Sequence, residues 1–400
     1  MSRRYTRPRG YPAGGRRGRS PCGVGVGSER PRPLSGDGKQ LVPDPGVRVW
    51  EFSGAMSAGP RPVATGPPSE DGEQGGDPVD LSTGLFVYEK TDLEVPDVLS
   101  AAVKRTYRPQ DSISYAFGIG TTSPYDVSIW GGPNVDGRDT IDFYRPDGGR
   151  VRYTRTNPGT PQTEAVYEAQ GSPGRFFRSK MRWNAQNGGW DLRFRDGAVY
   201  EFGNFTPLRA IRDRFGNELR ITRSNGASGR VTQLTTPNGR WVKFTYDAAS
   251  RVSEARDNGG RRAAYTYNTS GRLATATDPG GGTSTYTYDG FGRMTSVADA
   301  RGITFLRTTY DANGRAAEQT TADGATHRFA YTLDTAGRVE RTRVTAPRGS
   351  VREVSFNAEG YSTRDVRDLG GPSEQVTTYE REAATNLLRS SIDPLGRRTP

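Results

Sequence analysis

The sequence predicts an all-β protein built from repeated antiparallel hairpins. Three observations favour this fold class. A phrase of the type Tyr-x-Tyr-Asp recurs along the second half of the chain, and Asp-x-x-Gly turn signals recur midway between its copies. Between the turns, apolar and polar residues alternate with a period of two, which is the pattern of a strand with one buried face. Internal repeats of 20 to 50 residues indicate an array of similar units.

Copies of the phrase start at intervals of 21 to 23 residues, and most are followed by Gly-Arg. An Asp or Asn side chain at the start of a turn can accept hydrogen bonds from the backbone ahead, and Gly supplies a positive φ. We therefore predict that these residues fix the register of each hairpin. The predicted turn residues are Asp247, Arg251, Gly271, Arg272, Asp278, Asp289, Gly292, Arg293, Asp299, Asp311, Gly314, Arg315, Asp334, Gly337, Arg338, Asp393 and Gly396.

Each repeat holds two turns and two strands of about six residues, so seven hairpins give about fourteen strands. A twisted open sheet of that width curls, and the sequence therefore predicts a curled ribbon or spiral shell segment. We expect aromatic rows to fill its buried face and to join successive hairpins. The predicted sheet-face aromatic residues are Tyr246, Tyr265, Tyr267, Tyr286, Tyr288, Tyr310, Phe329, Tyr331, Phe356 and Tyr379.

Composition divides the chain into three parts. Residues 1–76 are rich in Gly, Pro and Arg and predict a disordered basic tail. Residues 77–210 contain short β-like runs without a regular period, which predicts a β-rich domain that caps the start of the ribbon. Residues 211–400 hold about seven repeats and stop after a midway turn, so we expect an N-terminal portion of something longer, or its remnant.

Two sets of residues carry a resemblance to a known family. The Tyr-Asp-x-x-Gly-Arg phrases resemble RHS/YD repeats, and residues 76–107 resemble the domain of unknown function that precedes RHS repeats in bacterial members. The stretch "VLSAAVK" departs from the Leu-Pro-Leu-like sequence usual in the family. Further matches are Thr91-Asp92-Leu93, Pro96 and Arg105-Thr106-Tyr107, and the leading motif consists of Gly76, Asp77, Pro78, Val79, Asp80, Thr83 and Gly84.

The resemblance implies a hollow shell. RHS repeats in the family wind into a cocoon that encloses a toxic C-terminal domain, and bacterial members are exported for contact-dependent killing, often by type VI secretion. Expected partners are therefore the rest of the shell, a toxin or other cargo domain, and secretion-system components. The plug and self-cleaving motif of many members are not recognised here. Because no secretory signal is recognised either, we expect a cytoplasmic protein that leaves by a non-classical route.

The sequence offers no constellation for catalysis, so we predict that the protein is not an enzyme and has no cofactor. His327 is the only histidine and Cys22 the only cysteine, which excludes cysteine-based metal sites. No apolar run is long enough to span a membrane. A GC-rich genome produces an excess of Arg over Lys without selection for nucleic-acid binding, so we predict no specific nucleic-acid partner. An alternative function is an adhesive surface module that binds carbohydrate through exposed Tyr and Arg rows.

Overall fold

The computed structural model describes residues 79–400 apart from 110, 136–137, 147, 170, 172–173, 205–206 and 226–228. Contacts divide the chain into units 1–42 and 43–400, and all described residues belong to the second unit. The predicted tail 1–76 lies outside the described residues, as do Gly76, Asp77 and Pro78 of the leading motif.

The described residues are almost entirely β-strand, with two 3-10 turns, η1 (Gln162–Glu164) and η2 (Gly174–Phe176). Seven short or medium strands come first and lie outside the main sheet. These strands are β1 (Val79–Asp80), β2 (Leu85–Phe86), β3 (Tyr88–Val95), β4 (Ala101–Tyr107), β5 (Ser114–Tyr115), β6 (Gly118–Ile119) and β7 (Thr121–Thr122).

The main sheet contains 25 strands, each antiparallel to the next strand in the chain, from β8 to β32. They are β8 (Ser128–Val135), β9 (Arg138–Tyr144), β10 (Arg150–Arg155), β11 (Val166–Glu168), β12 (Lys180–Asn184), β13 (Gly189–Arg193), β14 (Val199–Gly203), β15 (Leu208–Arg212), β16 (Glu218–Arg223), β17 (Val231–Thr235), β18 (Trp241–Tyr246), β19 (Val252–Asp257), β20 (Arg262–Tyr267), β21 (Leu273–Thr277), β22 (Thr283–Tyr288), β23 (Met294–Ala298), β24 (Thr304–Tyr310), β25 (Ala316–Thr321), β26 (Thr326–Leu333), β27 (Val339–Thr345), β28 (Val351–Phe356), β29 (Ser362–Arg367), β30 (Gln375–Arg381), β31 (Leu388–Ile392) and β32 (Arg398–Thr399).

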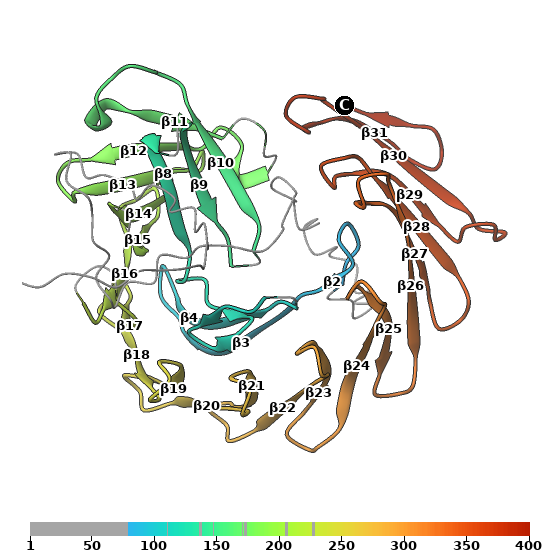
Figure 1. Cartoon of the computed structure of the whole chain (residues 1–400), viewed down its shortest axis with the longest axis horizontal. Helices are drawn as coiled ribbons and strands as arrows, with labels where there is room; N and C mark the ends of the chain where they lie inside the picture. The colour runs from blue at the N-terminus through green and yellow to red at the C-terminus, as the bar shows by residue number, and fades with distance from the viewer. Residues whose placement is uncertain are drawn as a thin grey trace, which may run out of the picture. The chain divides into compact units, whose positions relative to one another are not determined.

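The all-β prediction is confirmed, and the sheet is open and curled (Figure 1). It is wider than the ribbon of about fourteen strands expected from the repeats alone. Residues 128–210 form β8–β15, which pair in the same antiparallel order as the repeats and extend the same sheet. No sheet boundary therefore coincides with the predicted domain boundary at residue 210. The irregular spacing hid this continuity, because backbone pairing does not need a repeated sequence.

Side chains alternate between the two faces along most of the repeat strands, as β20 illustrates. In β20, Ala263 and Tyr265 are buried on the inner face, whereas Arg262 and Thr266 are exposed on the outer face. Threonine pairs join neighbouring strands on the outer face, with Thr266 Oγ1 and Thr275 Oγ1 2.6 Å apart. The period-two pattern read from the sequence therefore separates an apolar inner face from a hydroxyl-rich outer face.

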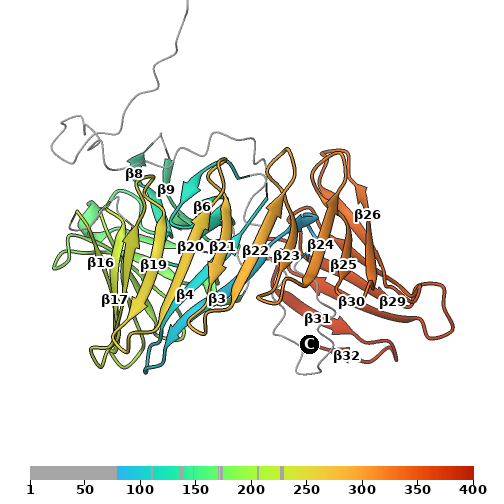
Figure 2. The same cartoon turned by 90° about the horizontal axis from the view of Figure 1, so that it is seen from below.

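The first strands lie against the inner face of the main sheet. β3 and β4 pair with each other, and the curved sheet passes around them (Figures 1 and 2). Leu93, Val95 and Val103 belong to the same buried cluster as Val242 and Leu273 of the repeats. The predicted N-terminal domain thus consists of two parts with different positions. Residues 79–127, which we call the inner segment, pack inside the curve, and residues 128–210 continue the sheet itself.

Candidate functional site

The Tyr-Asp turns share one hydrogen-bond pattern, which Asp289 illustrates. Its Oδ1 accepts the N–H groups of Phe291 and Arg293 at 3.0 and 2.9 Å, and its Oδ2 accepts Arg293 Nε at 2.7 Å. The Gly292 N–H donates to the Asp289 carbonyl, which closes the turn. A carboxylate that accepts three bonds satisfies most of the turn donors. The same side-chain-to-backbone pattern occurs at Asp247, Asp311, Asp334 and Asn357, and Asn268 shares its bond from the Arg N–H.

The midway turns repeat this geometry at the opposite ends of the strands. Asp278 Oδ1 accepts the N–H groups of Gly280 and Gly282 at 2.8 and 2.9 Å, and Asp393 bonds its own turn in the same way. Asp299 additionally accepts two side-chain bonds from Arg301. One kind of turn therefore joins the strands at both of their ends. The Tyr-Asp phrase encodes the turns at one end, and the midway phrase encodes those at the other.

The fourth residue of each turn adopts a positive φ. Gly271, Gly292, Gly314 and Gly337 have φ of 79, 76, 78 and 74°, and Gly396 on the other edge has 77°. The first Tyr-Asp turn has Ser250 at this place, with φ of 67°. An L-residue in the left-handed region costs roughly 1 kcal/mol. This turn, like the last one with Asn386 at φ of 57°, therefore forms against a local backbone preference that the glycine turns avoid.

The turn arginines connect each hairpin to the next. The Arg251 guanidinium lies over the Tyr267 ring at 4.2 Å, and Arg293 lies over Tyr310 at 4.7 Å. Arg272 faces Asn268 rather than a carboxylate; it lies over Tyr288 at 5.8 Å. Arg315 lies over Tyr331 at 6.0 Å, while Arg338 pairs with Asp334 at 2.7 Å. Each stacked pair spans two successive repeats, where a cation–π contact contributes about 0.5–1 kcal/mol.

A ladder of tyrosine hydroxyls gives a second connection between repeats. Each hydroxyl donates to the backbone carbonyl of the residue that follows the turn Arg position in the preceding hairpin. Tyr246 and Tyr267 reach Val231 and Val252 at 2.6 Å each. The remaining rungs are Tyr288 to Leu273 at 2.8 Å, Tyr310 to Met294 at 2.6 Å and Tyr331 to Ala316 at 2.7 Å.

Burial raises the pKa of Tyr246, Tyr267, Tyr288 and Tyr310 above that of free tyrosine. Their hydroxyls therefore stay protonated and able to donate across the neutral range. This ladder explains why Tyr, rather than any apolar residue, stands before the turn Asp. A phenol fills the inner face and also satisfies a carbonyl that the strand ladder leaves unpaired.

The carbonyls are available because every hairpin carries a β-bulge beside its Tyr-Asp turn. The register shifts between Thr266 and Tyr267, and equivalent shifts precede Tyr246, Tyr288, Tyr310, Leu333 and Phe356. A bulge turns backbone groups out of the ladder. The sequence offered no pattern that predicted these bulges.

The later repeats change the residue that makes the connection. Leu333 stands opposite Val339, where earlier hairpins have tyrosine, and Tyr331 makes the bond from two residues upstream. In the last hairpin the register places Arg381, and not Tyr379, at the equivalent position. Arg381 Nε donates to the Ser362 carbonyl at 2.8 Å. The alignment of Tyr379 with the Tyr of the phrase is therefore corrected, since a guanidinium replaces the phenol two residues later.

The remaining five aromatic residues of the predicted set are also wholly or partly buried. Tyr265, Tyr286, Phe329 and Phe356 are buried, and Tyr379 is half-buried in β30. None of the ten is exposed to solvent.

The inner segment binds the same bulge residues through their N–H groups. Val252 N–H donates to the Ala116 carbonyl at 2.7 Å, and Met294 N–H donates to the Tyr107 hydroxyl at 2.7 Å. Ala316 N–H donates to the Gly84 carbonyl at 2.8 Å. Each of these residues donates its N–H to the inner segment, and its C=O accepts a tyrosine hydroxyl from the next repeat. Gly84 of the leading motif therefore contacts the fourth Tyr-Asp hairpin.

The rest of that motif orders the start of the inner segment. Asp80 accepts bonds from Ser82 and Thr83, with Thr83 Oγ1 to Asp80 Oδ2 at 2.8 Å. Val79 packs with Phe329 and Val344. These contacts form a compact turn. They place the Leu81 carbonyl where it accepts a hydrogen bond from Thr342 Oγ1 at 2.6 Å.

A buried ionic cluster joins the inner segment to β20 and β22. Arg105 contacts Asp92 through two bonds of 2.5 and 2.9 Å, and its Nη2 donates to the Tyr286 hydroxyl at 2.7 Å. The Tyr265 hydroxyl donates to Asp92 at 2.9 Å. Both charged side chains are at most 5% exposed. A charge pair so deeply buried requires this complete set of partners.

The electrostatics of this cluster follow from burial and proximity. Burial opposes the charged form of Arg105, but the Asp92 carboxylate outweighs it and keeps the Arg105 pKa above its usual value. Burial, then the neighbouring Tyr286, raises the pKa of Tyr88 to about 12. Burial and the Asp92 charge likewise raise the pKa of Tyr265. The cluster therefore holds one fixed ion pair surrounded by neutral phenols.

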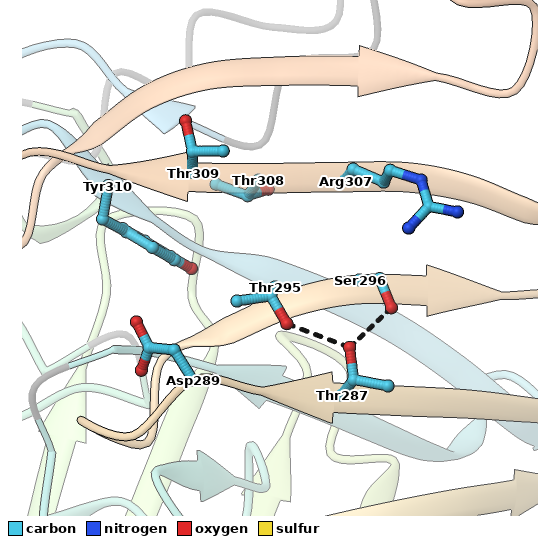
Figure 3. Close-up of a pocket in the computed structure, with 8 residues that line it drawn as sticks. All are labelled: Thr287, Asp289, Thr295, Ser296, Arg307, Thr308, Thr309 and Tyr310. Carbon is cyan, nitrogen blue, oxygen red and sulfur yellow. Dashed lines mark hydrogen bonds between the residues drawn. The ribbon is translucent and has the colours of Figure 1, made fainter.

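The outer face carries a pocket of about 400 Å³ beside β22, β23 and β24 (Figure 3). Six of its eight lining residues carry a hydroxyl group, and Thr287 Oγ1 bonds both Thr295 and Ser296 at 2.9 and 2.6 Å. The Asp289 carboxylate at its rim is committed to its own turn. The lining holds no pair of nucleophile and base, so the pocket shows no arrangement for acyl or glycosyl transfer.

His327 is half-buried in β26 opposite Gln319. Within the described ranges, no group of three or more His, Cys, Asp and Glu side chains is placed to hold a metal ion. Helices long and apolar enough to cross a membrane are likewise not found in that part of the chain.

Comparison with protein families identifies both parts of the architecture. Residues 76–153 match "Domain of unknown function (DUF6531)", and residues 225–263, 267–304 and 310–351 match "RHS Repeat". The chain carries RHS repeats behind a DUF6531 domain. The three matched segments cover hairpins from β17 to β28, and the preceding domain covers the inner segment and the first strands of the sheet.

Solved structures with similarity include "Crystal Structure of TcdB2-TccC3-TEV", at 10% identity, TM-score 0.34, and coverage of 78% of this chain and 22% of that one. A second, "Crystal Structure of TcdB2-TccC3", has 12% identity, TM-score 0.34, and coverage of 75% and 20%. The RHS chain described here thus spans about a fifth of the length of these structures. No curated protein matches the sequence.

Sequence reasoning missed the central role of Asp92, Arg105 and Tyr107. They were noticed only as parts of the family resemblance, and no contact was assigned to them. Alternation with Val103 and Tyr107 buries Arg105, but it would expose Asp92, which directly precedes the buried Leu93. Asp92 reaches Arg105 because the register of β3 shifts between Thr91 and Leu93. A buried Arg predicts a charged partner, but neither the bulge nor the distant tyrosines that complete the cluster.

Proposed function

We propose that this RHS protein is a structural shell segment that encloses a cargo polypeptide, such as a C-terminal toxin used in bacterial competition, until delivery. The role is non-catalytic. The wall is the repeat sheet, and the inner segment is its internal brace. Secretion from the cytoplasm by a non-classical route belongs to the same proposal.

One observation carries the proposal. The sheet grows by equal hairpins, each hydrogen-bonded to the next, and its curved inner face is held by the chain's own N-terminal residues at Val252, Met294 and Ala316. Such a wall can be extended by further repeats without new contacts of another kind. A wall that curves around an interior suits containment, and the described residues show no constellation that suits a reaction.

The test uses the polypeptide encoded by the complete reading frame. We expect the segment that follows the repeats to resist protease in the native protein and to be cleaved when it is produced alone. Removing the buried ion pair with Asp92→Ala and Arg105→Ala should detach the inner segment and abolish the protection. Arg328→Thr on the outer face should preserve it. Equal cleavage of the segment inside and outside the protein would contradict containment.

The alternative, carbohydrate binding through exposed Tyr and Arg rows, gains no support from the tyrosines. Stacking on a sugar needs an exposed ring face, and the repeat tyrosines lie on the inner face with their hydroxyls bonded to carbonyls. Shell formation is therefore the function that these side chains support.

A further inference from the structure

Three cations stand side by side on the outer face of the sheet. Cα pairing sets Lys243 of β18 opposite Arg256 of β19, and Arg256 opposite Arg262 of β20. All three side chains are exposed. Like charges directly opposite each other on neighbouring strands are destabilising. One carboxylate is close, Glu254 at 3.7 Å from Arg262, which leaves the row with an excess of two positive charges.

Comparison among the repeats shows that the fold does not require this row. Arg256 and Arg262 flank a midway turn, and the pairs that flank the other midway turns from β15 to β32 are not like-charged. Thr277 and Thr283 share a hydrogen bond of 2.9 Å at this place, and Arg212 and Glu218 form an ion pair of 2.7 Å. The other pairs are Thr235/Trp241, Ala298/Thr304, Thr320/Thr326, Thr345/Val351, Arg367/Gln375 and Ile392/Arg398.

We propose that the row formed by Lys243, Arg256 and Arg262, the outer cationic row, binds a linear polysaccharide that carries carboxylate groups. Guanidinium groups bind carboxylates through two parallel hydrogen bonds. The three strands place the charges along about 10 Å, perpendicular to the strands. Exposed Thr245 and Thr266 beside the row supply hydroxyls that can bond sugar hydroxyl groups.

The surroundings favour an acidic polysaccharide over a nucleic acid. Proteins that bind single strands without sequence preference stack the bases on accessible aromatic rings. The aromatic residue on these strands' outer face is Trp241, and the Lys243 ammonium covers its ring at 4.6 Å. A row of three cations also falls short of the six to ten phosphate contacts of typical duplex binders.

The test measures the affinity of the complete chain for polygalacturonate, with neutral dextran and oligothymidylate as comparison ligands. We expect binding to polygalacturonate that weakens with salt, and no binding to dextran. The double change Arg256→Thr and Arg262→Thr recreates the pair at Thr277 and Thr283 and removes the like-charge repulsion, so the thermal midpoint should stay the same or rise while affinity falls about tenfold.

The matched control removes two outer cations elsewhere, with Arg307→Thr and Arg328→Thr, and should leave affinity within about twofold of the wild type. If the first double variant does not fold, Arg262→Glu recreates the pairing of Arg212 with Glu218 and should lower affinity in the same direction. Absence of polygalacturonate binding, equal loss in the control, or tighter binding of oligothymidylate would each overturn the proposal.

Discussion

The repeats from β18 to β25 and those from β26 to β31 share their turns, apart from the longer last turn at 382–387, but differ in their connections. In the first group, tyrosine hydroxyls bond the preceding repeat, and the inner segment binds the bulges at Val252, Met294 and Ala316. In the second group, Tyr331 makes one such bond from two residues upstream. Leu333 and Phe356 have no hydroxyl, and Arg381 replaces tyrosine. The difference shows that each hairpin depends on its own turn residues, whereas the contacts between hairpins depend on other residues that can vary.

The largest difference should come from two ion pairs: the inner-segment pair that contacts the first group through Tyr265 and Tyr286, and a pair within the second group. Arg105→Ala leaves the Asp92 carboxylate buried without a partner, which costs about 3–5 kcal/mol of unfolding free energy. Arg352→Ala in the later group removes a pair whose arginine is 46% exposed, and should cost less than about 1 kcal/mol. Urea unfolding followed by tryptophan fluorescence measures both losses, and equal losses would remove the distinction between the groups.

The tyrosine ladder offers a smaller, reciprocal test. Tyr267→Phe deprives the Val252 carbonyl of its partner and should cost about 1–2 kcal/mol. Phe356→Tyr places a hydroxyl at the equivalent position of a later hairpin and should gain about 0.5–1.5 kcal/mol. The same urea experiment checks both. A Tyr267→Phe protein as stable as the wild type would show that the ring alone joins the repeats.

Exchanging a turn residue between repeats should change stability in opposite directions. Ser250→Gly relieves a positive φ of 67° and should raise unfolding free energy by about 1 kcal/mol. Gly337→Ser introduces the same strain at φ of 74°, where no atom obstructs a Cβ, and should lower it by about the same amount. Thermal unfolding of the two variants provides the measurement, and shifts of the same sign would contradict the strain argument.

The smallest effect is the pH dependence of one turn. Several hydrogen bonds lower the pKa of Asp334, and the bond from the Arg338 backbone N–H has the largest effect. A lowered carboxylate pKa contributes stability above the ordinary value near 4, and this stability is lost as the pH falls through the lowered value. The thermal midpoints of wild type and Asp334→Asn should therefore differ most above about pH 4 and converge in stronger acid. A constant difference down to about pH 2.5 would exclude the ionic contribution.

The sequence predicted the parts of the fold that depend on short stretches. Period-two alternation indicates the strands, and Asp, Gly and Arg at fixed spacing indicate the turns in which Asp289, Gly292 and Arg293 lie. What could not be predicted depends on residues far apart in the chain. The bond from Tyr267 to Val252 joins two repeats, and that from Arg105 to Tyr286 spans 181 positions. The extension of the sheet through residues 128–210 was missed because its strands lack a repeat.

The tyrosine ladder has a direction, because each hydroxyl points back to the hairpin synthesised before it. A newly made repeat therefore finds its acceptor already in place while the chain is still emerging, and no repeat has to wait for a later one. Duplication or loss of one unit of 21 to 23 residues preserves the reading direction of every remaining bond. Such proteins can change length during evolution by whole units, with the same donor and acceptor meeting at each new junction.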